Sequence, residues 1–169
     1  WRCMKKYVLV LDVGTTNIKA FLFDRKGTIA GEVKAQPAYI FEKEGHVEQD
    51  PDEIRDLSIK VLRKIIKTKR LKAENIVSLG ITTQRSSFLM WDKNTGKKLT
   101  NIITWQDKRC ARYAEKKTNL FWLKAVRGFA KTFRGIIPSA QLLLMSILKF
   151  DTVHSSSRTG YLFEHNPDL

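Results

Sequence analysis

The stretch VLVLDVGTTNIKAFLFD, residues 8–24, decides the fold. Two apolar runs, Val8–Leu11 and Ile18–Phe23, flank a polar bend at residues 12–17. The first run is continuous, which is typical of a strand buried on both faces. The bend holds a carboxylate, a glycine and two adjacent hydroxyls, which is more than the closure of a hairpin requires. The stretch therefore predicts a buried β-hairpin and raises the question of what its tip binds.

Length and composition indicate a packed domain or part of one. The chain has 169 residues, and 43% of them are hydrophobic. Its two cysteines, Cys3 and Cys110, and its three histidines form no metal-ligand spacing or disulfide framework. No signal peptide or membrane-spanning stretch is expected. A reducing, cytoplasmic setting is therefore the default prediction.

Basic residues exceed acidic ones by 31 − 17 = 14, and the excess is concentrated. Lys60–Lys72 holds seven basic residues, and Lys108–Arg134 holds nine against Glu115 alone. Such a field attracts polyanions, including nucleic acid, anionic lipid and nucleoside phosphates. No aromatic-basic nucleic-acid motif accompanies it, so we favour a solvated lysine face or a surface that an acidic partner domain covers.

The pattern along the chain alternates strands with a helix. A turn at residues 24–27 leads to a third strand, Ile29–Val33, which completes an antiparallel meander. Asp50 is a good N-cap for a helix over Pro51–Lys69, and Glu53 can complete a capping box. The apolar stripe of this helix lies at 3-4 spacing and consists of Ile54, Leu57, Val61, Leu62, Ile65 and Ile66.

The second half of the chain continues with strands at Ile76–Thr82, Phe88–Trp91 and Ile102–Trp105. Asp107 is expected to cap a helix through about Lys117, Pro138 to open another through Leu148, and residues from Ser155 onward to form a loop. Three strands, a helix and a strand begin an α/β, ribonuclease-H-like domain of the actin and hexokinase ATPase type, with a mixed sheet and flanking helices. The chain is expected to contain only part of such a domain.

The bend of the first hairpin suits a phosphate. Gly14 lets the backbone approach an anion, Thr15 and Thr16 add hydroxyls, and Lys19 adds a cation. Asp12, at the strand end, could hold Mg²⁺ through water. Taken alone, the residues equally allow a hairpin whose threonines only close the turn.

Five motifs follow one another along the chain: GHVEQDP at residues 45–51, GITTQR at 80–85, WD at 91–92, TGK at 95–97 and ITWQDKR at 103–109. In this order and spacing they resemble the FGGY carbohydrate kinases, and most closely the glycerol kinases with their divergent animal type. The family has G-W-V-E-Q-D-P at the first motif, where His46 stands for Trp, and G-I-T-N-Q-R at the second. The resemblance covers residues 6–109 and is weak over 110–169. It implies a partial N-terminal kinase domain, with the second, adenosine-binding domain outside this chain.

The resemblance also implies residue roles, with ATP and Mg²⁺ as cofactors. The phosphate loop would comprise Gly14, Thr15, Thr16 and Asn17, with Lys19 near the γ-phosphate and Asp12 near the metal. Arg85 would bind the hydroxyls of a small polyol or sugar, with Gln84 and Ser86 beside it and Trp105 as an apolar wall. The catalytic base is expected downstream of Leu169, so no catalytic residue is assigned in this chain.

Two departures from the glycerol kinases concern the substrate. Ser86 stands where they have a glutamate that grips glycerol, and residues 136–139, IIPS, replace a tyrosine motif. The first prediction is still phosphorylation of a polyol, glycerol to glycerol 3-phosphate, by a full-length protein that could be a homo-oligomer. The chain alone is expected to be inactive. Two alternatives stay open: a non-catalytic pseudokinase or regulatory protein, and a ribonuclease-H-type nuclease.

Overall fold

The computed structural model describes residues 6–133, 136 and 139–167. The chain divides into two compact units, each with its own internal packing. The first comprises Trp1–Glu42 and Val47–Thr104, and the second comprises Lys43–His46 and Trp105–Leu169. We describe each unit by itself.

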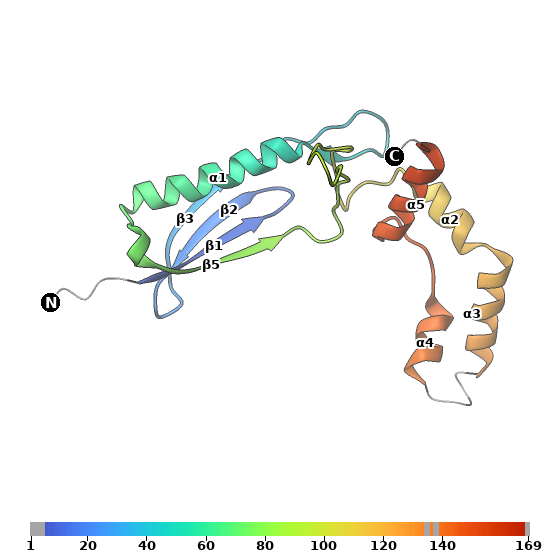
Figure 1. Ribbon diagram of the computed structural model, residues 1–169. Coiled ribbons are helices and arrows are strands. Elements are labelled where there is room, and N and C mark those ends of the chain that lie inside the picture. The colour runs from blue at the N-terminus through green and yellow to red at the C-terminus, as the bar shows by residue number, and fades with distance from the viewer. Residues whose placement is uncertain (1–5, 134–135, 137–138, 168–169) are drawn as a thin grey trace. The chain divides into compact units, whose positions relative to one another are not determined.

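A four-stranded mixed sheet forms the frame of the first unit (Figure 1). Its strands lie in the order β3-β2-β1-β5, with antiparallel pairing of β1 to β2 and of β2 to β3, and parallel pairing of β1 to β5. The bounds are Tyr7–Val13 for β1, Ile18–Phe23 for β2, Ile29–Ala35 for β3 and Ile76–Thr83 for β5. The predicted meander, the later strand and the mixed sheet are confirmed.

Helix α1, Pro51–Thr68, packs on one face of this sheet. Its Val61 and Ile65 are 1% exposed, and burying an aliphatic side chain of this size contributes about 1.5–3 kcal/mol. The core that α1 forms with the sheet is apolar and comprises Leu9, Leu11, Ile18, Ala20, Leu22, Ile54, Val61, Ile65 and Ile102. The predicted apolar stripe is therefore confirmed. On the same helix Lys60, Lys64 and Lys67 are exposed, so its lysines are solvated.

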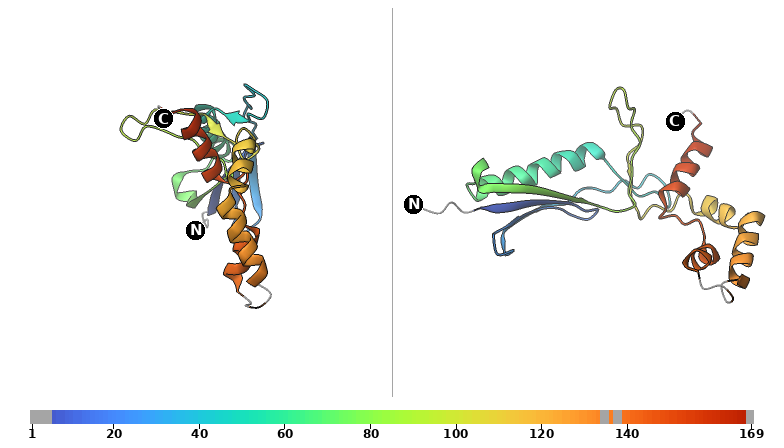
Figure 2. Two further views of the ribbon diagram at one scale, coloured as in Figure 1. Left: turned by 90° about the vertical axis from the view of Figure 1, so that its right-hand side faces the viewer. Right: turned by 60° about the horizontal axis from the view of Figure 1, so that its bottom comes forward.

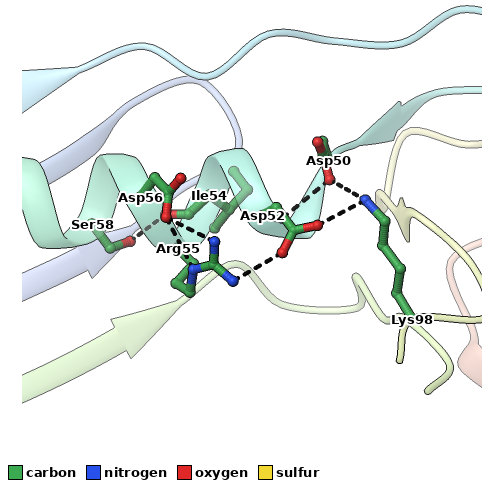
Figure 3. Close-up of polar contacts among 7 residues, drawn as sticks. All are labelled: Asp50, Asp52, Ile54, Arg55, Asp56, Ser58 and Lys98. Atoms are coloured by element: carbon green, nitrogen blue, oxygen red, sulfur yellow. Dashed lines mark hydrogen bonds and ion pairs between the residues drawn. The ribbon is translucent and has the colours of Figure 1, made fainter. Parts of the chain in front are cut away.

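The start of α1 is held by charged side chains (Figure 3). Asp50 caps the helix, as predicted, by accepting the Asp52 backbone N–H at 3.1 Å. Lys98 donates to Asp50 at 2.6 Å and lies 3.0 Å from an Asp52 oxygen. Glu53 accepts the backbone N–H of Ala38 at 3.1 Å, which ties the first turn of the helix to the preceding loop.

Residues 84–104 depart from the prediction. Before this segment, a short 3₁₀ turn, η1 (Ala73–Asn75), leads into β5. Within it, β6 (Ile102–Ile103) pairs with the short strand β4 (Glu48–Gln49). The strand predicted at Phe88–Trp91 is wrong, because this segment forms only isolated bridges, Phe88 to Ile103 and Trp91 to Lys98. Such single pairings hold a hairpin loop without extending the sheet.

The second unit is helical, with α2 at Ala111–Thr118, α3 at Phe121–Phe133, α4 at Ala140–Ile147 and α5 at Ser155–His165 (Figure 2). The prediction that Asp107 caps α2 is wrong. Asp107 accepts the Arg109 backbone N–H at 3.0 Å and pairs with the Arg109 guanidinium at 2.8 Å, while Cys110 occupies the N-cap position. The predicted opening of α4 at Pro138 lies outside the described residues.

The loop predicted from Ser155 onward is wrong, because Ser155–His165 form helix α5. Its inner face buries Ser157, Arg158 and Leu162. Arg158 donates to the backbone oxygens of Thr152 at 2.6 Å and Trp105 at 3.1 Å. These polar contacts hold α5 in place without the apolar stripe that α1 has. None of the helices within residues 6–133 and 139–167 has the length and apolar character needed to cross a bilayer.

Candidate phosphate and substrate site

The carboxylate and the cation predicted for the site lie on one face of the sheet. In the strand register Asp12 is opposite Lys19 of β2 and beside Thr82 of β5. Paired residues project to the same face, and their neighbours Leu11 and Ala20 are buried under α1. Asp12 and Lys19 therefore project from the opposite face. The Lys19 ammonium lies 3.8 Å from a Glu32 oxygen and 5.7 Å from the Phe21 ring centroid.

The bend after Asp12 needs its glycine. The Gly14 N–H donates to the backbone oxygen of Asn17 at 3.1 Å. A Cβ on Gly14 would lie 2.8 Å from that same oxygen, closer than carbon and oxygen approach without a shift. The Gly14 N–H thus closes the turn, and the exposed Thr16 lies at its tip.

Two glutamines hold the bend in place. Gln49, which is fully buried, donates to the Thr15 backbone oxygen at 2.8 Å. The Gln84 side chain donates to Gln49 at 3.2 Å, and its backbone N–H donates to Val13 at 2.9 Å. Ser87 donates to the Gln84 side-chain oxygen at 3.0 Å. This chain of hydrogen bonds joins three of the motifs identified in the sequence.

Sequence reasoning did not assign a role to Gln49. Its position inside GHVEQDP, and the rarity of a fully buried glutamine, are the signals that could have found it. Gln84 was predicted to contact the substrate. Both ends of its amide are engaged within the protein, which favours a positioning role for it.

Arg85 and Ser86 follow the end of β5 after one intervening residue, Gln84. Because β1 and β5 are parallel, their carboxyl ends meet at one edge of the sheet, where ligands of α/β folds commonly bind. Both residues are exposed, and Ser86 has a left-handed backbone with φ of 58°. Such a conformation costs a non-glycine residue about 1–2 kcal/mol, and strained residues of this kind concentrate at functional sites.

Trp105, the predicted apolar wall, belongs to the second unit. Its side chain is 45% exposed, and its backbone oxygen accepts a hydrogen bond from Arg158. Its role beside Arg85 stays a prediction. In the tyrosine-motif segment, residues 137–138 lie outside the described ones.

The described residues hold no group of three or more His, Cys, Asp or Glu side chains placed to bind a metal ion. A two-metal nuclease site needs such a cluster. The oxygen donors at the bend, the Asp12 carboxylate and the threonine hydroxyls, are of the kind that Mg²⁺ prefers with part of its water shell retained.

Comparison with known proteins places the chain in a family. Residues 7–144 match the N-terminal domain of the FGGY family of carbohydrate kinases, and the chain belongs to this family. It is 34% identical over 163 residues to glycerol kinase 5 of Danio rerio, covering 96% of this chain and 31% of that protein. It is 45% identical over 106 residues to glycerol kinase 2 of Thermotoga maritima, covering 63% and 21%.

A solved structure supports the fold. The chain superimposes on Plasmodium falciparum glycerol kinase with ADP at a TM-score of 0.74 and 24% identity, covering 97% of this chain and 30% of that one. This likeness confirms the predicted fold class. The chain spans between a fifth and a third of the length of the two curated relatives.

Proposed function

We propose that the protein to which this chain belongs transfers the γ-phosphoryl group of ATP to a small polyol, with glycerol as the first candidate and glycerol 3-phosphate as the product. The observation that carries the proposal is the hydrogen-bonded chain from Thr15 through Gln49 to Gln84. It couples the phosphate bend to the segment that bears Arg85, at the sheet edge where β1 and β5 end. The relatives named glycerol kinase support the same activity.

On this proposal the first unit binds the phosphates. Gly14, Thr15, Thr16 and Asn17 surround them, and Lys19 neutralises charge near the γ-phosphate. Asp12 would hold Mg²⁺ through water, and the ion would supply positive charge to offset that of the phosphates. The chain's own contribution is to position the phosphates by the closed bend, whose shape Gly14 and Gln49 maintain.

In the first unit, Arg85 binds the hydroxyls of the polyol, because the guanidinium presents donors in a planar fork that suits vicinal hydroxyls. For Trp105, in the second unit, the family resemblance implies the role of an apolar wall. Ser86 accepts a hydrogen bond without charge. A charged acceptor contributes about 1.5–3 kcal/mol against about 1 kcal/mol for a neutral one, so glycerol should bind more weakly than to a site with glutamate.

A second candidate is a pseudokinase that binds the same ligands without turnover, and Ser86 is the observation that favours it. The base that would deprotonate the polyol is expected outside residues 1–169, so the chain alone should be inactive. A nuclease is less favoured, because the described residues bring no carboxylate cluster together. A cytoplasmic location and a homo-oligomer belong to the proposal for the full-length protein.

The test is a panel of polyols and sugars with ATP and Mg²⁺ on full-length protein. Arg85→Ala should raise KM for the best substrate, Ser86→Glu should lower KM for glycerol about tenfold, and Lys19→Ala should raise KM for ATP. Arg25→Ala, on the exposed turn between β2 and β3, is the matched control and should change nothing. Unchanged KM and kcat in Arg85→Ala would show that the polyol site lies elsewhere, and nucleotide binding without turnover of any substrate would support the pseudokinase.

A further inference from the structure

Of the side chains that the structure describes, Arg158 is the largest one that is completely buried, and it carries a charge. Its Nε donates to the backbone oxygen of Thr152 at 2.6 Å, and its Nη2 donates to that of Trp105 at 3.1 Å. All three residues belong to the second unit. The chain itself buries Arg158, so no part of the protein outside residues 1–169 is needed to explain these contacts. The guanidinium thus joins the segment before α5 to the turn that begins at Trp105.

Helix α5, which carries Arg158, is held closely against α2. The rings of Tyr113 on α2 and Tyr161 on α5 meet edge to face with their centroids 6.3 Å apart. A Cβ on Gly160 would collide with the Tyr113 hydroxyl, so the two helices approach here as closely as a glycine allows. Lys117 lies 3.9 Å from a Glu164 oxygen at the outer side of this contact. Arg158 therefore projects from a helix that has little room to slide.

The turn after Trp105 is held by a second buried charge. Asp107 is 0% exposed, accepts the Arg109 backbone N–H at 3.0 Å and pairs with the Arg109 guanidinium at 2.8 Å. Trp105, by contrast, is 45% exposed. A half-exposed ring has fewer neighbours to fix it by packing than a buried one, so the course of its backbone decides where it stands. Arg158 holds that backbone at Trp105 itself, and Asp107 holds it two residues further on.

We propose that Arg158 is a positioning residue for polyol binding: from α5 it fixes the backbone of Trp105 and thereby the place of the indole. The inference rests on the proposed function, in which Trp105 is the apolar wall of the polyol site. A misplacement of about 1 Å in a residue that orients the substrate can reduce the rate about 100-fold. The phosphates of ATP are assigned to the bend in the first unit, so the loss should fall on the polyol. A purely structural Arg158 would instead support only the amount of folded enzyme, and its replacement would lower kcat and leave both KM values unchanged.

The first experiment is steady-state kinetics on the full-length Arg158→Lys variant. Lysine keeps the positive charge, but its ammonium does not reproduce the planar fork that donates to two oxygens. KM for the polyol should rise about fivefold, as for the loss of one hydrogen bond, and KM for ATP should not change. The matched control is Ser157→Ala on the same helix. Ser157 is also 0% exposed, and its hydroxyl forms no hydrogen bond with any residue that the structure describes, so both KM values should stay the same.

A second substitution tests whether Arg158 acts through Trp105. In a Trp105→Ala background, Arg158→Lys should leave KM for the polyol at the value of Trp105→Ala alone. An equal rise in both backgrounds would overturn the proposal, since Arg158 would then act without the indole. Circular dichroism confirms that each variant is folded.

A further measurement needs no turnover. In protein labelled with fluorotryptophan, the fluorine NMR signal of Trp105 is assigned by its absence in Trp105→Phe. Arg158→Lys should shift this signal, and Ser157→Ala should not. An unshifted signal would overturn the positioning role even if the kinase assay succeeds. A shifted signal in a protein that phosphorylates no polyol would support the positioning of Trp105 and count against the proposed function alone.

Discussion

The two units of the chain bury different chemistry. The first buries aliphatic side chains of a sheet and a helix in one continuous core. The second buries Asp107 and Arg158, both 0% exposed, while Phe121 and Trp122 stay in solvent. Apolar burial is non-directional and tolerates small shifts, whereas a buried charge is tolerated only where hydrogen bonds compensate its lost hydration. The first unit therefore depends mainly on packing volume, whereas the second combines the burial of Leu123, Ala130 and Leu162 with a few directed polar contacts.

Arg158 shows how narrow that dependence is. Burial lowers its pKa, but a guanidinium remains charged in proteins, so the cation needs its two backbone acceptors. Burial likewise raises the pKa of the neighbouring Cys110 thiol, which is therefore kept protonated and unreactive. The hydrogen bonds of Arg158 therefore stabilise the packing of this unit.

The largest expected effect is that of Arg158→Ala. It removes a buried cation and leaves the Thr152 and Trp105 oxygens without its donors, each a loss of about 1–3 kcal/mol, with a cavity in addition. We expect about 3–5 kcal/mol of destabilisation, measured by amide hydrogen exchange over residues 105–162. Arg112→Ala, exposed on α2, is the control and should be neutral. Equal loss of protection over residues 54–65 would show that the two cores do not differ in the way argued.

The counterpart in the first unit is Ile65→Ala. This side chain is 1% exposed between α1 and the sheet, and its truncation should cost about 2–4 kcal/mol through lost transfer free energy and a residual cavity. Denaturant unfolding followed by circular dichroism measures it. Ile59→Ala on the same helix, where the side chain is 39% exposed, should cost less than about 1 kcal/mol. Similar losses at the two positions would contradict the assigned core.

Gln49→Ala tests the polar exception inside the first unit. The variant removes the donor to the Thr15 backbone oxygen and the acceptor of the Gln84 side-chain N–H, for an expected loss of about 1–3 kcal/mol. Hydrogen exchange should rise at residues 13–17, and in full-length protein KM for ATP should rise with it. Gln36→Ala, which changes an exposed glutamine of the same unit, serves as the control. A stable variant with unchanged exchange at the bend would show that Gln49 does not hold it.

The same contrast explains what could be predicted from the sequence. Apolar runs predicted strands β1, β2, β3 and β5, and the 3-4 spacing of apolar residues predicted helix α1. Both patterns arise because residues on the buried face of a strand or helix recur at a fixed period. Helix α5 was not predicted because its buried residues include Ser157 and Arg158, and residues of these polar types are usually exposed. No helix was assigned over residues 121–133, where the large apolar residues are exposed and the buried ones are few.

The candidate site divides in the same way. The bend at Gly14–Asn17 and Arg85 could be proposed as site residues from motifs alone, since local chemistry is visible in a short stretch. Gln49 was not, because its purpose arises only when residues 15, 49 and 84 meet in space. The strand predicted at Phe88–Trp91 was wrong for a related reason. Its apolar residues gain only isolated bridges, not a neighbouring strand.

The smallest expected effect belongs to the charges at the start of α1, where packing and charge meet. Lys98 and the Asp52 backbone N–H both donate to Asp50 and lower the pKa of its carboxyl. Because the folded pKa is lower than the unfolded value of about 3.9, the ionised form stabilises the fold above that value. The contribution is lost as pH falls through the folded pKa. Both side chains are about two-fifths exposed, so solvent screening keeps the ion pair itself below about 1 kcal/mol.

Two substitutions separate the cap from the charge. Asp50→Asn keeps a capping oxygen and removes the ion pair, so it should lose a few tenths of a kcal/mol at pH 7 and should lose less stability than the wild type as pH falls below the unfolded pKa of about 3.9. Asp50→Ala removes both and should lose about 1 kcal/mol. Thermal unfolding at pH values from neutral to below that pKa, at low and high salt, measures the difference. If Asp50→Asn retains the pH dependence of the wild type, another carboxyl is responsible, and the cap stabilises α1 by hydrogen bonding alone.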